Sequence, residues 1–216
     1  MPYRRKARFA CYLAHILGPG RSGIWRTEEN LDTPRQVSPL IIRVARPDEL
    51  DAVVSIDDDA SVLYTQAGTE VALPADHPFV VAERGRFRDA IDNERLHLAV
   101  RDGVAVAFMA LSLVDGAPYL DQLSVRSDSM RSGIGTQLVR FALRQGHPHP
   151  LWLTTYAHLP WNRPYYERFG FCVAPEHQDG PELREILRLQ RETLPDPHER
   201  VAMVAGMQRT SLDAPR

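Results

Sequence analysis

The stretch from Leu123 to Val139 reads L-S-V-R-S-D-S-M-R-S-G-I-G-T-Q-L-V, and it decides the fold. It predicts a strand, a short loop with two glycines, and an amphipathic helix from Gly133 to Gln145. Neither Gly133 nor Gly135 has a Cβ, so a ligand can approach the backbone closely. A helix N-terminus favours an anion, and Arg131 adds positive charge. The stretch indicates a pyrophosphate-binding loop, although a plain helix start gives the same pattern.

Two other phosphate-binding motifs do not fit this stretch. A P-loop contains Gly-Lys-Ser/Thr, and no lysine is present here. The dinucleotide-binding fingerprint needs a third glycine, and position 138 holds Leu138 instead. We therefore do not expect a nucleotide-binding enzyme of either class.

A second stretch, from Leu153 to Phe171, reads L-T-T-Y-A-H-L-P-W-N-R-P-Y-Y-E-R-F-G-F. We expect a short buried strand before it and a helix over residues 161–169. Strand–R-x-G-x-G–helix followed by strand–Asn–Tyr-Glu-x-x-Gly-Phe resembles the GNAT N-acetyltransferase superfamily in order and spacing. The resemblance covers residues 40 to about 206. The form P-W-N-x-P-x-Y is similar to a bacterial branch of that superfamily.

The resemblance implies an α/β (α+β) fold. Its sheet is mixed and mostly antiparallel, is flanked by helices, and is splayed between the fourth and fifth strands. Here the splay falls between residues 119–125 and 151–155. The implied co-substrate is acetyl-CoA, with no metal. Its pantetheine arm would pair with backbone at Leu123 and Val125, and Asn162 would hydrogen-bond to it. The residues implied in cofactor binding are Leu123, Ser124, Val125, Arg131, Ser132, Gly133, Ile134, Gly135, Thr136 and Asn162.

The sequence departs from the family pattern in three places. The usual Gln or Arg three residues before the first glycine is Met130, which removes one side-chain contact. The strand that often carries paired acids reads Asp121-Gln122, and the strand before the second motif offers Thr154 and Thr155 without a Glu. The identity of the general base therefore stays open.

The chemistry sets a demand on the missing base. An alkyl ammonium has a pKa of about 10.4, so freeing its lone pair at pH 7 costs about 4.6 kcal/mol. Asp121 is our candidate, as base or as ammonium anchor, although a cross-strand salt bridge or a charge at the hairpin end is the more common role of such a residue. The resemblance implies that Tyr166 protonates the leaving thiolate, which is uphill by about 2 kcal/mol. An N–H near Ser124 or Val125 is the candidate oxyanion donor.

Other residues carry weaker functional readings. Tyr64 and Thr155 are candidate contacts for the acceptor, and Tyr166 could instead be a core aromatic residue. His147, His149 and His158 suggest a metal site only superficially, because prolines flank two of them and no other ligand cluster is spaced to help.

The remaining elements follow from periodicity and turn chemistry. Asp-Gly pairs at 102–103 and 115–116 predict two β-hairpins. We read residues 68–82 as loop, because Gly68, Pro74 and Pro78 interrupt it, and we place a helix only over 86–93. Strands are expected at 40–44, 96–100, 104–114, 119–125, 151–155, 171–173 and 201–204, and further helices at 47–56, 60–66 and 181–193.

Composition sets the domain organisation. Of the 216 residues, we expect 1–38 to be a poorly ordered extension, 39–208 a GNAT domain and 209–216 a tail. A formal net charge of −2 gives no sign of nucleic acid as a partner. No apolar run approaches the roughly 20 residues of a membrane helix. Two cysteines do not form a disulfide framework.

Together these features predict a cytoplasmic bacterial enzyme. It would move an acetyl group from acetyl-CoA to a primary amine of a small molecule or peptide, by direct attack in a ternary complex. The alternative is a catalytically weak acyl-CoA-binding module that acts as a sensor or partner-binding domain, which Met130 and the absent Glu motivate. A monomer and a homodimer both stay open.

Overall fold

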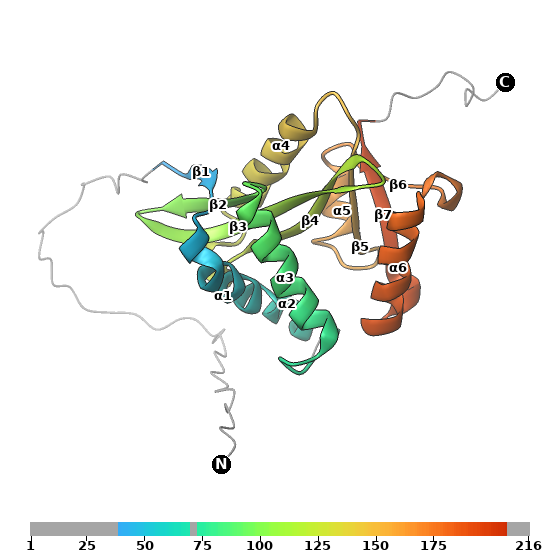
Figure 1. The fold of residues 1–216 in the computed structure, drawn as a ribbon, viewed down its shortest axis with the longest axis horizontal. Helices are drawn as coiled ribbons and strands as arrows, with labels where there is room; N and C mark the ends of the chain where they lie inside the picture. The colour runs from blue at the N-terminus through green and yellow to red at the C-terminus, as the bar shows by residue number, and fades with distance from the viewer. Residues whose placement is uncertain (1–38, 70–72, 207–216) are drawn as a thin grey trace, which may run out of the picture. The chain divides into compact units, whose positions relative to one another are not determined.

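The computed structural model describes residues 39–69 and 73–206, and the predicted extension and tail lie outside them. The strands of the described chain form one sheet in the order β1-β2-β3-β4-β5-β7-β6 (Figure 1). Their bounds are β1 Ile41–Val44, β2 Leu96–Arg101, β3 Val104–Val114, β4 Ala117–Val125, β5 Leu151–Tyr156, β6 Cys172–Val173 and β7 Arg200–Ala205. This mixed sheet is the predicted architecture, and each strand prediction is confirmed to within a few residues.

Two tight hairpins build the middle of the sheet. Asp102 and Gly103 join β2 to β3, and Asp115 and Gly116 join β3 to β4. All four residues have positive φ, between 52° and 76°. A two-residue hairpin turn of this type needs that conformation at both positions, which Asp-Gly tolerates well. The prediction of hairpins at these two places is confirmed.

The sheet opens between β4 and β5. These two strands run parallel and pair only at Tyr119 with Trp152 and at Leu120 with Leu153. All other strand pairs in the described chain are antiparallel. Beyond Leu120 the two strands diverge, so the β5-facing edge of β4 from Asp121 to Val125 has no strand partner. The predicted splay between the fourth and fifth strands is confirmed.

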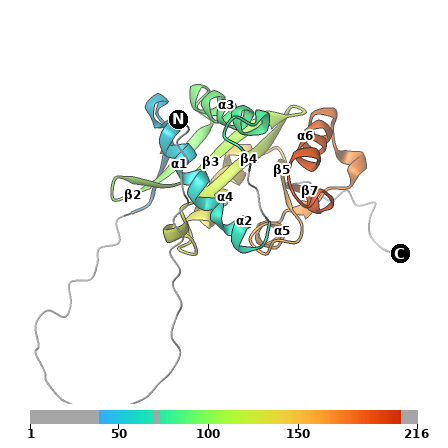
Figure 2. The ribbon, with the colours of Figure 1, turned by 90° about the horizontal axis from the view of Figure 1, so that it is seen from below.

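Helices cover both faces of the sheet, and Figure 2 shows the two layers from below. Helices α1 and α3 pack on one face with Leu98 and Phe108, and α6 packs on the same face with Tyr119. Helices α4 and α5 lie on the other face, where Leu120 is buried. The helix bounds are α1 Leu50–Ala60, α2 Val62–Gln66, α3 Pro78–Asp92, α4 Ile134–Gly146, α5 Arg163–Glu167 and α6 Pro181–Thr193.

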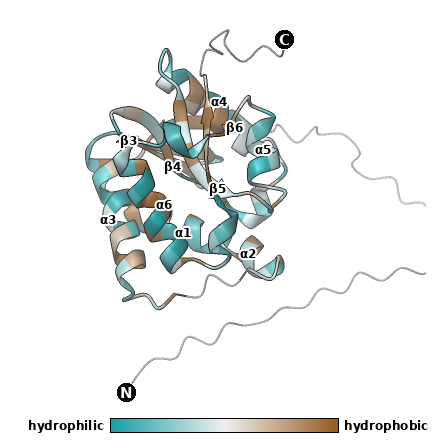
Figure 3. Cartoon of the chain, turned by 90° about the vertical axis from the view of Figure 1, so that its right-hand side faces the viewer, coloured by the Kyte–Doolittle hydropathy of each residue, from teal (hydrophilic) through white to brown (hydrophobic). Residues whose placement is uncertain are grey.

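The apolar core has three parts. One cluster lies under α4 and joins residues of β2, β3, β4, β5 and β7. On the opposite face, α1 and α3 form one cluster with β2 and β3, and α6 forms a separate one with β4 and β7. Figure 3 shows the matching pattern, with teal outer faces on the helices and brown segments turned toward the sheet.

Two helix predictions need correction. The segment 68–82 is not all loop, because α3 begins at Pro78. His77 caps it by accepting a hydrogen bond from Phe79 N, and proline at the first helical position lacks the N–H that would have no partner there. The helix predicted over 161–169 is shorter and spans Arg163–Glu167. None of the helices in the described part of the chain has the length and apolar character needed to cross a membrane.

Candidate active site

A cleft of about 950 Å³ opens where β4 and β5 diverge. Its volume lies at the upper end of the range of small-molecule sites. Residues of α1, α2, α3, β4, α4, β5, α5, α6 and β7 line it. The unpaired edge of β4 gives the cleft free backbone donors and acceptors, which an extended ligand can use as a neighbouring strand would.

The loop before α4 supplies a row of N–H groups to this cleft. The first hydrogen bond of α4 runs from Gln137 N to Gly133 O, at 3.1 Å. The N–H groups of residues 134–136 therefore have no acceptor within the helix. Arg131, Gly133, Gly135 and Thr136 all line the cleft. Free amides at a helix N-terminus beside an arginine fit a pyrophosphate group.

The two glycines of this loop are needed for different reasons. Gly133 has φ +82°, and a Cβ there would point into open space. Its left-handed φ is a conformation that favours glycine, and the space beside its backbone is open, as the prediction of close approach by a ligand requires. At Gly135 a Cβ would lie 2.8 Å from Tyr165 Oη. The protein's own packing thus requires Gly135, which sequence reasoning had explained by the ligand alone.

The structure brings most of the predicted site residues together. The cleft is lined by Tyr64, Asp121, Leu123, Ser124, Val125, Arg131, Gly133, Gly135, Thr136, Thr155, Asn162 and Tyr166. Ser132 and Ile134 do not line it. Ser132 Oγ donates to Ser129 O at 2.6 Å, and the side chain of Ile134 is buried in the core. Ile134 can therefore offer a ligand only its backbone amide, and the Ser132 hydroxyl already uses its donor.

Asn162 has an unused donor in the cleft wall. The residue is 7% exposed, and its Nδ2 has no hydrogen-bond partner among the described residues. An unpaired buried donor costs about 1–3 kcal/mol. A ligand carbonyl removes that cost, and the amides of a pantetheine arm carry such carbonyls.

Tyr166 lies against other aromatic rings and faces the cleft. Its ring centroid is 5.4 Å from that of Tyr165 and 5.6 Å from that of Phe171. Burial raises the pKa of Tyr166 well above its usual value, so the phenol is neutral at any physiological pH. A neutral hydroxyl can donate a hydrogen bond to a departing thiolate. Burial would also raise the pKa of a departing thiol in the cleft. The difference between the pKa of that thiol and the pKa of Tyr166 therefore changes less than either value.

Four carboxylates line the cleft from α1, α3 and β4: Asp57, Asp58, Glu83 and Asp121. Asp57 Oδ1 accepts hydrogen bonds from Ser124 Oγ at 2.6 Å and from Gln122 Nε2 at 2.7 Å. Asp121 is held differently, because its Oδ2 accepts from Arg86 Nε at 3.2 Å. This contact supports the alternative interpretation of Asp121 as a salt-bridge partner. Asp121 also lines the cleft.

Burial raises the pKa of both Asp57 and Glu83, and that of Glu83 falls in the range suited to proton transfer. Burial and then the charge of Asp57 raise the pKa of Glu83 to about 7, and Arg86 opposes this. Its side chain is 26% exposed, and its Oε1 lies 3.8 Å from Arg86 Nη2. A base with a pKa near the working pH is present in its active form and still accepts a proton well.

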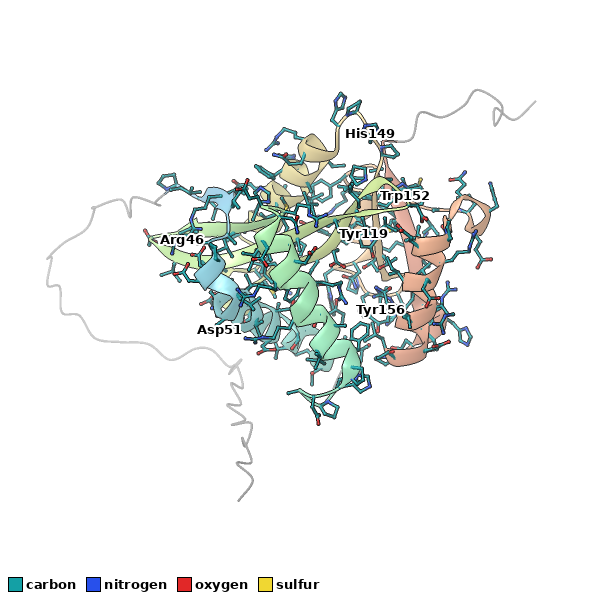
Figure 4. All side chains as sticks on the ribbon, viewed as in Figure 1. Arg46, Asp51, Tyr119, His149, Trp152 and Tyr156 are labelled. Atoms are coloured by element: carbon teal, nitrogen blue, oxygen red, sulfur yellow. The ribbon has the colours of Figure 1, made fainter. Side chains whose placement is uncertain are left out.

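Across the cleft, β7 contributes a buried cation that contacts residues of β5 and α6. Arg200 is 7% exposed, and its guanidinium carbon lies 4.6 Å from the ring centroid of Tyr156. Tyr119 Oη lies 2.7 Å from Thr154 Oγ1, and Arg200 Nη2 reaches the same oxygen at 3.3 Å. Burial raises the pKa of Tyr119 to about 12, so this network holds its protons. In the view of Figure 4, Tyr119 and Tyr156 lie between α3 and α6.

Sequence reasoning missed Asp57, Glu83 and Arg200. The run Asp57-Asp58-Asp59 was a visible signal for the first of these. Nothing in the sequence marked Glu83, because it falls between the segment read as loop and the helix placed after it. The histidines form no metal site in the described chain, where no three His, Cys, Asp or Glu side chains are grouped suitably.

Comparison with known proteins agrees with this geometry. The sequence model of the acetyltransferase (GNAT) family matches residues 61–171, more than half of the chain. The protein therefore belongs to the GNAT acetyltransferase family.

Solved structures share its fold. PaiA N-acetyltransferase from Thermoplasma acidophilum, in complex with coenzyme A, has a TM-score of 0.52 and 13% identity over 77% of this chain and 98% of that one. A GNAT family acetyltransferase from Bacillus cereus has a TM-score of 0.52 and 15% identity, over 80% of this chain and 100% of that one.

N-acetylglutamate synthase from Neisseria gonorrhoeae, complexed with coenzyme A and N-acetyl-glutamate, gives a TM-score of 0.57 and 16% identity over 80% of this chain. The present chain spans only 36% of the length of that protein. At these identities the likeness concerns the fold alone.

Proposed function

We propose that this protein transfers an acetyl group from acetyl-CoA to a primary amine of a small molecule or peptide, by direct attack within a ternary complex. The observation that carries the proposal is the composition of one cleft. It joins the amides before α4, the hydroxyl of Tyr166 and the carboxylate of Glu83. These are an anion-binding loop, a proton donor and a proton acceptor. Family membership supports the acetyl transfer, and coenzyme A bound to proteins of the same fold supports the donor.

The donor would lie along β4. Its pyrophosphate would contact the amides of residues 131–136, and its pantetheine arm would pair with the unpaired edge at Leu123 and Val125. Asn162 Nδ2 would donate to a pantetheine carbonyl. An N–H near Ser124 or Val125 is the proposed oxyanion donor. Met130 lines the same cleft in place of a polar side chain, so the backbone would provide most of the contacts.

Glu83 would take the proton of the attacking amine. Transfer from an alkyl ammonium to a carboxylate with a pKa of about 7 is uphill by about 3.4 pKa units, or roughly 4.6 kcal/mol. An ordinary glutamate would make it uphill by about 8 kcal/mol. The raised pKa of Glu83 therefore removes nearly half of the cost. Asp121, our earlier candidate, stays a proposed ammonium anchor.

The thiolate leaves at the other end of the reaction. Tyr166 would donate its proton, or a hydrogen bond, to the sulfur as the bond to the acetyl carbon breaks. Tyr64 and Thr155 line the cleft and are proposed to contact the acceptor. The alternative function is an acyl-CoA-binding module without turnover, which is suggested by Met130 and by the absent Glu. The raised pKa of Glu83 favours the enzyme.

Two measurements test the proposal. Acetyl-CoA at 100 times its dissociation constant should stabilise the fold by about 2.7 kcal/mol and raise the unfolding midpoint by several degrees, whereas NADH and ATP should not. Release of free thiol should then follow on addition of a primary amine. Stabilisation without thiol release from a broad amine panel would support the binding module, and no stabilisation would contradict both readings.

Tyr166→Phe should lower kcat at least about tenfold and leave stabilisation by acetyl-CoA intact, since it removes only the proton donor. Tyr165→Phe is the matched control. It removes the neighbouring hydroxyl, which is buried against Gly135. Equal losses of kcat in both variants would show that aromatic packing, rather than proton donation, explains Tyr166.

A further inference from the structure

Arg200 is a buried cation without a matching anion. It begins β7 opposite Tyr156 of β5 and is 7% exposed. Among the described residues, no carboxylate forms an ion pair with it, although ion pairs occur elsewhere in the same chain. Its hydrogen-bond acceptors are neutral: Gln190 Oε1 at 2.6 Å and Thr154 Oγ1 at 3.3 Å, both from Nη2. Its Nε has no hydrogen-bond partner in the described part of the chain.

In this arrangement no nearby negative charge offsets the cost of burying the guanidinium. Removing a charge from water costs several kcal/mol, which a partner of opposite charge normally offsets. Here the neighbours are the ring of Tyr156 and two neutral oxygens, and Arg191 adds a second cation nearby, with its Nη2 donating to Arg200 O at 3.0 Å. Burial lowers the pKa of Arg200, but a guanidinium still keeps its proton.

Arg200 also lines the cleft, together with Thr154, Gln190 and Tyr156. These residues come from β5, β7 and α6. The carboxylates of Asp57 and Glu83 line the same cleft from α1 and α3, on the other side of the splay (Figure 1). The acceptor side of the cleft thus carries negative charge on one wall and an unmatched positive charge on the other.

We propose that Arg200 is the binding site for a carboxylate of the acceptor, so that the acceptor is a small amine that also carries a carboxylate. The inference rests on the proposed acetyl transfer and names its substrate class. The ammonium would approach Asp57 and Glu83 while the carboxylate meets the free N–H groups of Arg200. Gln190 and Thr154 use the two donors of Nη2, so the carboxylate would meet Nε or Nη1 in a charge-assisted hydrogen bond, which is about twice as strong as a neutral one. A dianionic phosphate fits less well, because four carboxylates line the same cleft and repel its second negative charge.

The test uses acceptors whose amine is remote from the varied group, so that the pKa of the amine hardly changes: an ω-amino acid, its carboxamide and the corresponding alkylamine. Thiol release from acetyl-CoA gives kcat/KM for each. The wild type should prefer the amino acid over its carboxamide by about 10–100-fold, the range of a charge-assisted hydrogen bond. Equal or better use of the carboxamide would overturn the proposal while leaving acetyl transfer established.

Variants test whether Arg200 causes the preference for an acceptor with a carboxylate. Arg200→Gln should remove it, by lowering kcat/KM for the amino acid far more than for the carboxamide. Arg200→Lys keeps the charge without the planar fork and should retain part of it. Arg188→Gln is the matched control, because Arg188 lies on α6, pairs with Glu185 and Glu192, and does not line the cleft. A preference that survives Arg200→Gln in a folded protein would contradict the assignment.

A binding measurement keeps the proposal testable without turnover. In the presence of coenzyme A, the wild-type protein should gain more thermal stability from the amino acids than from their carboxamides at equal concentration. This holds whether or not acetyl transfer is detected and does not depend on the folding of any variant. No difference across a panel of amino acids would exclude a carboxylate site at Arg200. Absence of thiol release with every amine would instead contradict the proposed function.

Discussion

Glu83 shows how one residue's surroundings set its chemistry. An exposed glutamate would be a poor base for an alkyl ammonium. Placed on α3 beside Asp57 and largely out of water, Glu83 has a pKa of about 7. Its neighbours thus make the protonated form more stable in the folded protein than in the unfolded chain. The same shift must appear in both the pH dependence of activity and the pH dependence of stability.

For activity, we expect kcat at saturating amine to rise with pH through about 7 in the wild type, as Glu83 loses its proton. Glu83→Gln should lose that limb and lower kcat by about 10²–10⁴-fold. The measurement is a kcat profile from pH 5.5 to 9, with Glu94→Gln as the control because Glu94 is exposed outside the cleft. An unchanged limb in Glu83→Gln would assign the base elsewhere.

Glu83 changes the free energy of unfolding with pH in the opposite direction to a salt-bridged acid, whose pKa is lowered by folding. The folded state binds the Glu83 proton up to about pH 7 and the unfolded state only up to about 4.5, so Glu83 lowers the free energy of unfolding as pH rises through this window. Glu83→Gln should therefore stabilise the protein at pH 8, by up to about 3 kcal/mol, and change little at pH 4. Urea unfolding at the two pH values measures the difference.

Gly135 is the second residue whose role was visible only in three dimensions. Gly135→Ala should destabilise the fold by about 1–3 kcal/mol, because its Cβ meets Tyr165 Oη. In a Tyr165→Phe background the same change should be neutral or mildly stabilising, since alanine favours the helix. Thermal unfolding of the four proteins measures the coupling. Simple addition of the two single effects would show that the contact does not matter.

At the scale of elements, α6 depends on a hairpin far from it in sequence. Both carboxylate oxygens of Asp115 accept hydrogen bonds from its first turn, Oδ1 from Glu182 N and Oδ2 from Leu183 N, each at 3.0 Å. A Cβ on Gly180 would collide with this carboxylate. The cap therefore anchors the helix that carries Gln190, the partner of Arg200.

Asp115→Ala should cost about 1–2 kcal/mol, the usual price of a lost helix cap, plus any strain at its positive φ. Asp102→Ala is a close control. Asp102 also has φ 52° and precedes the glycine of a hairpin, but no helix begins beside it. The difference between the two variants isolates the cap, and equal midpoints of urea unfolding would argue against it.

Elements whose signals are local were predictable from the sequence. The Asp-Gly hairpins, the loop before α4 and the diverging strands each depend on a few neighbouring residues. Residues that become functional through burial were not. Glu83 needs α3 to begin at Pro78 and to turn that face to the cleft, and Arg200 needs α6 and β5 to enclose it. These contacts join residues that are far apart in the sequence, so no local sequence pattern predicts them.

At the scale of the whole molecule, the sheet consists of two half-sheets joined by two residue pairs of β4 and β5. A donor lying along the free edge of β4 would join them. We expect acetyl-CoA to slow amide hydrogen exchange in β4 and β5 but not in β1, which lies at the far edge of the sheet. Unchanged exchange in β4 would place the donor elsewhere.

The divided core on the sheet face covered by α1, α3 and α6 has an evolutionary consequence. Because α1 and α3 pack in one cluster and α6 in another, a mutation that reshapes one wall leaves the packing of the other intact. The cluster under α4, on which the loop before that helix rests, is separate from both. Sequence change can therefore alter either wall of the cleft one step at a time, while the packing beneath that loop is inherited unchanged.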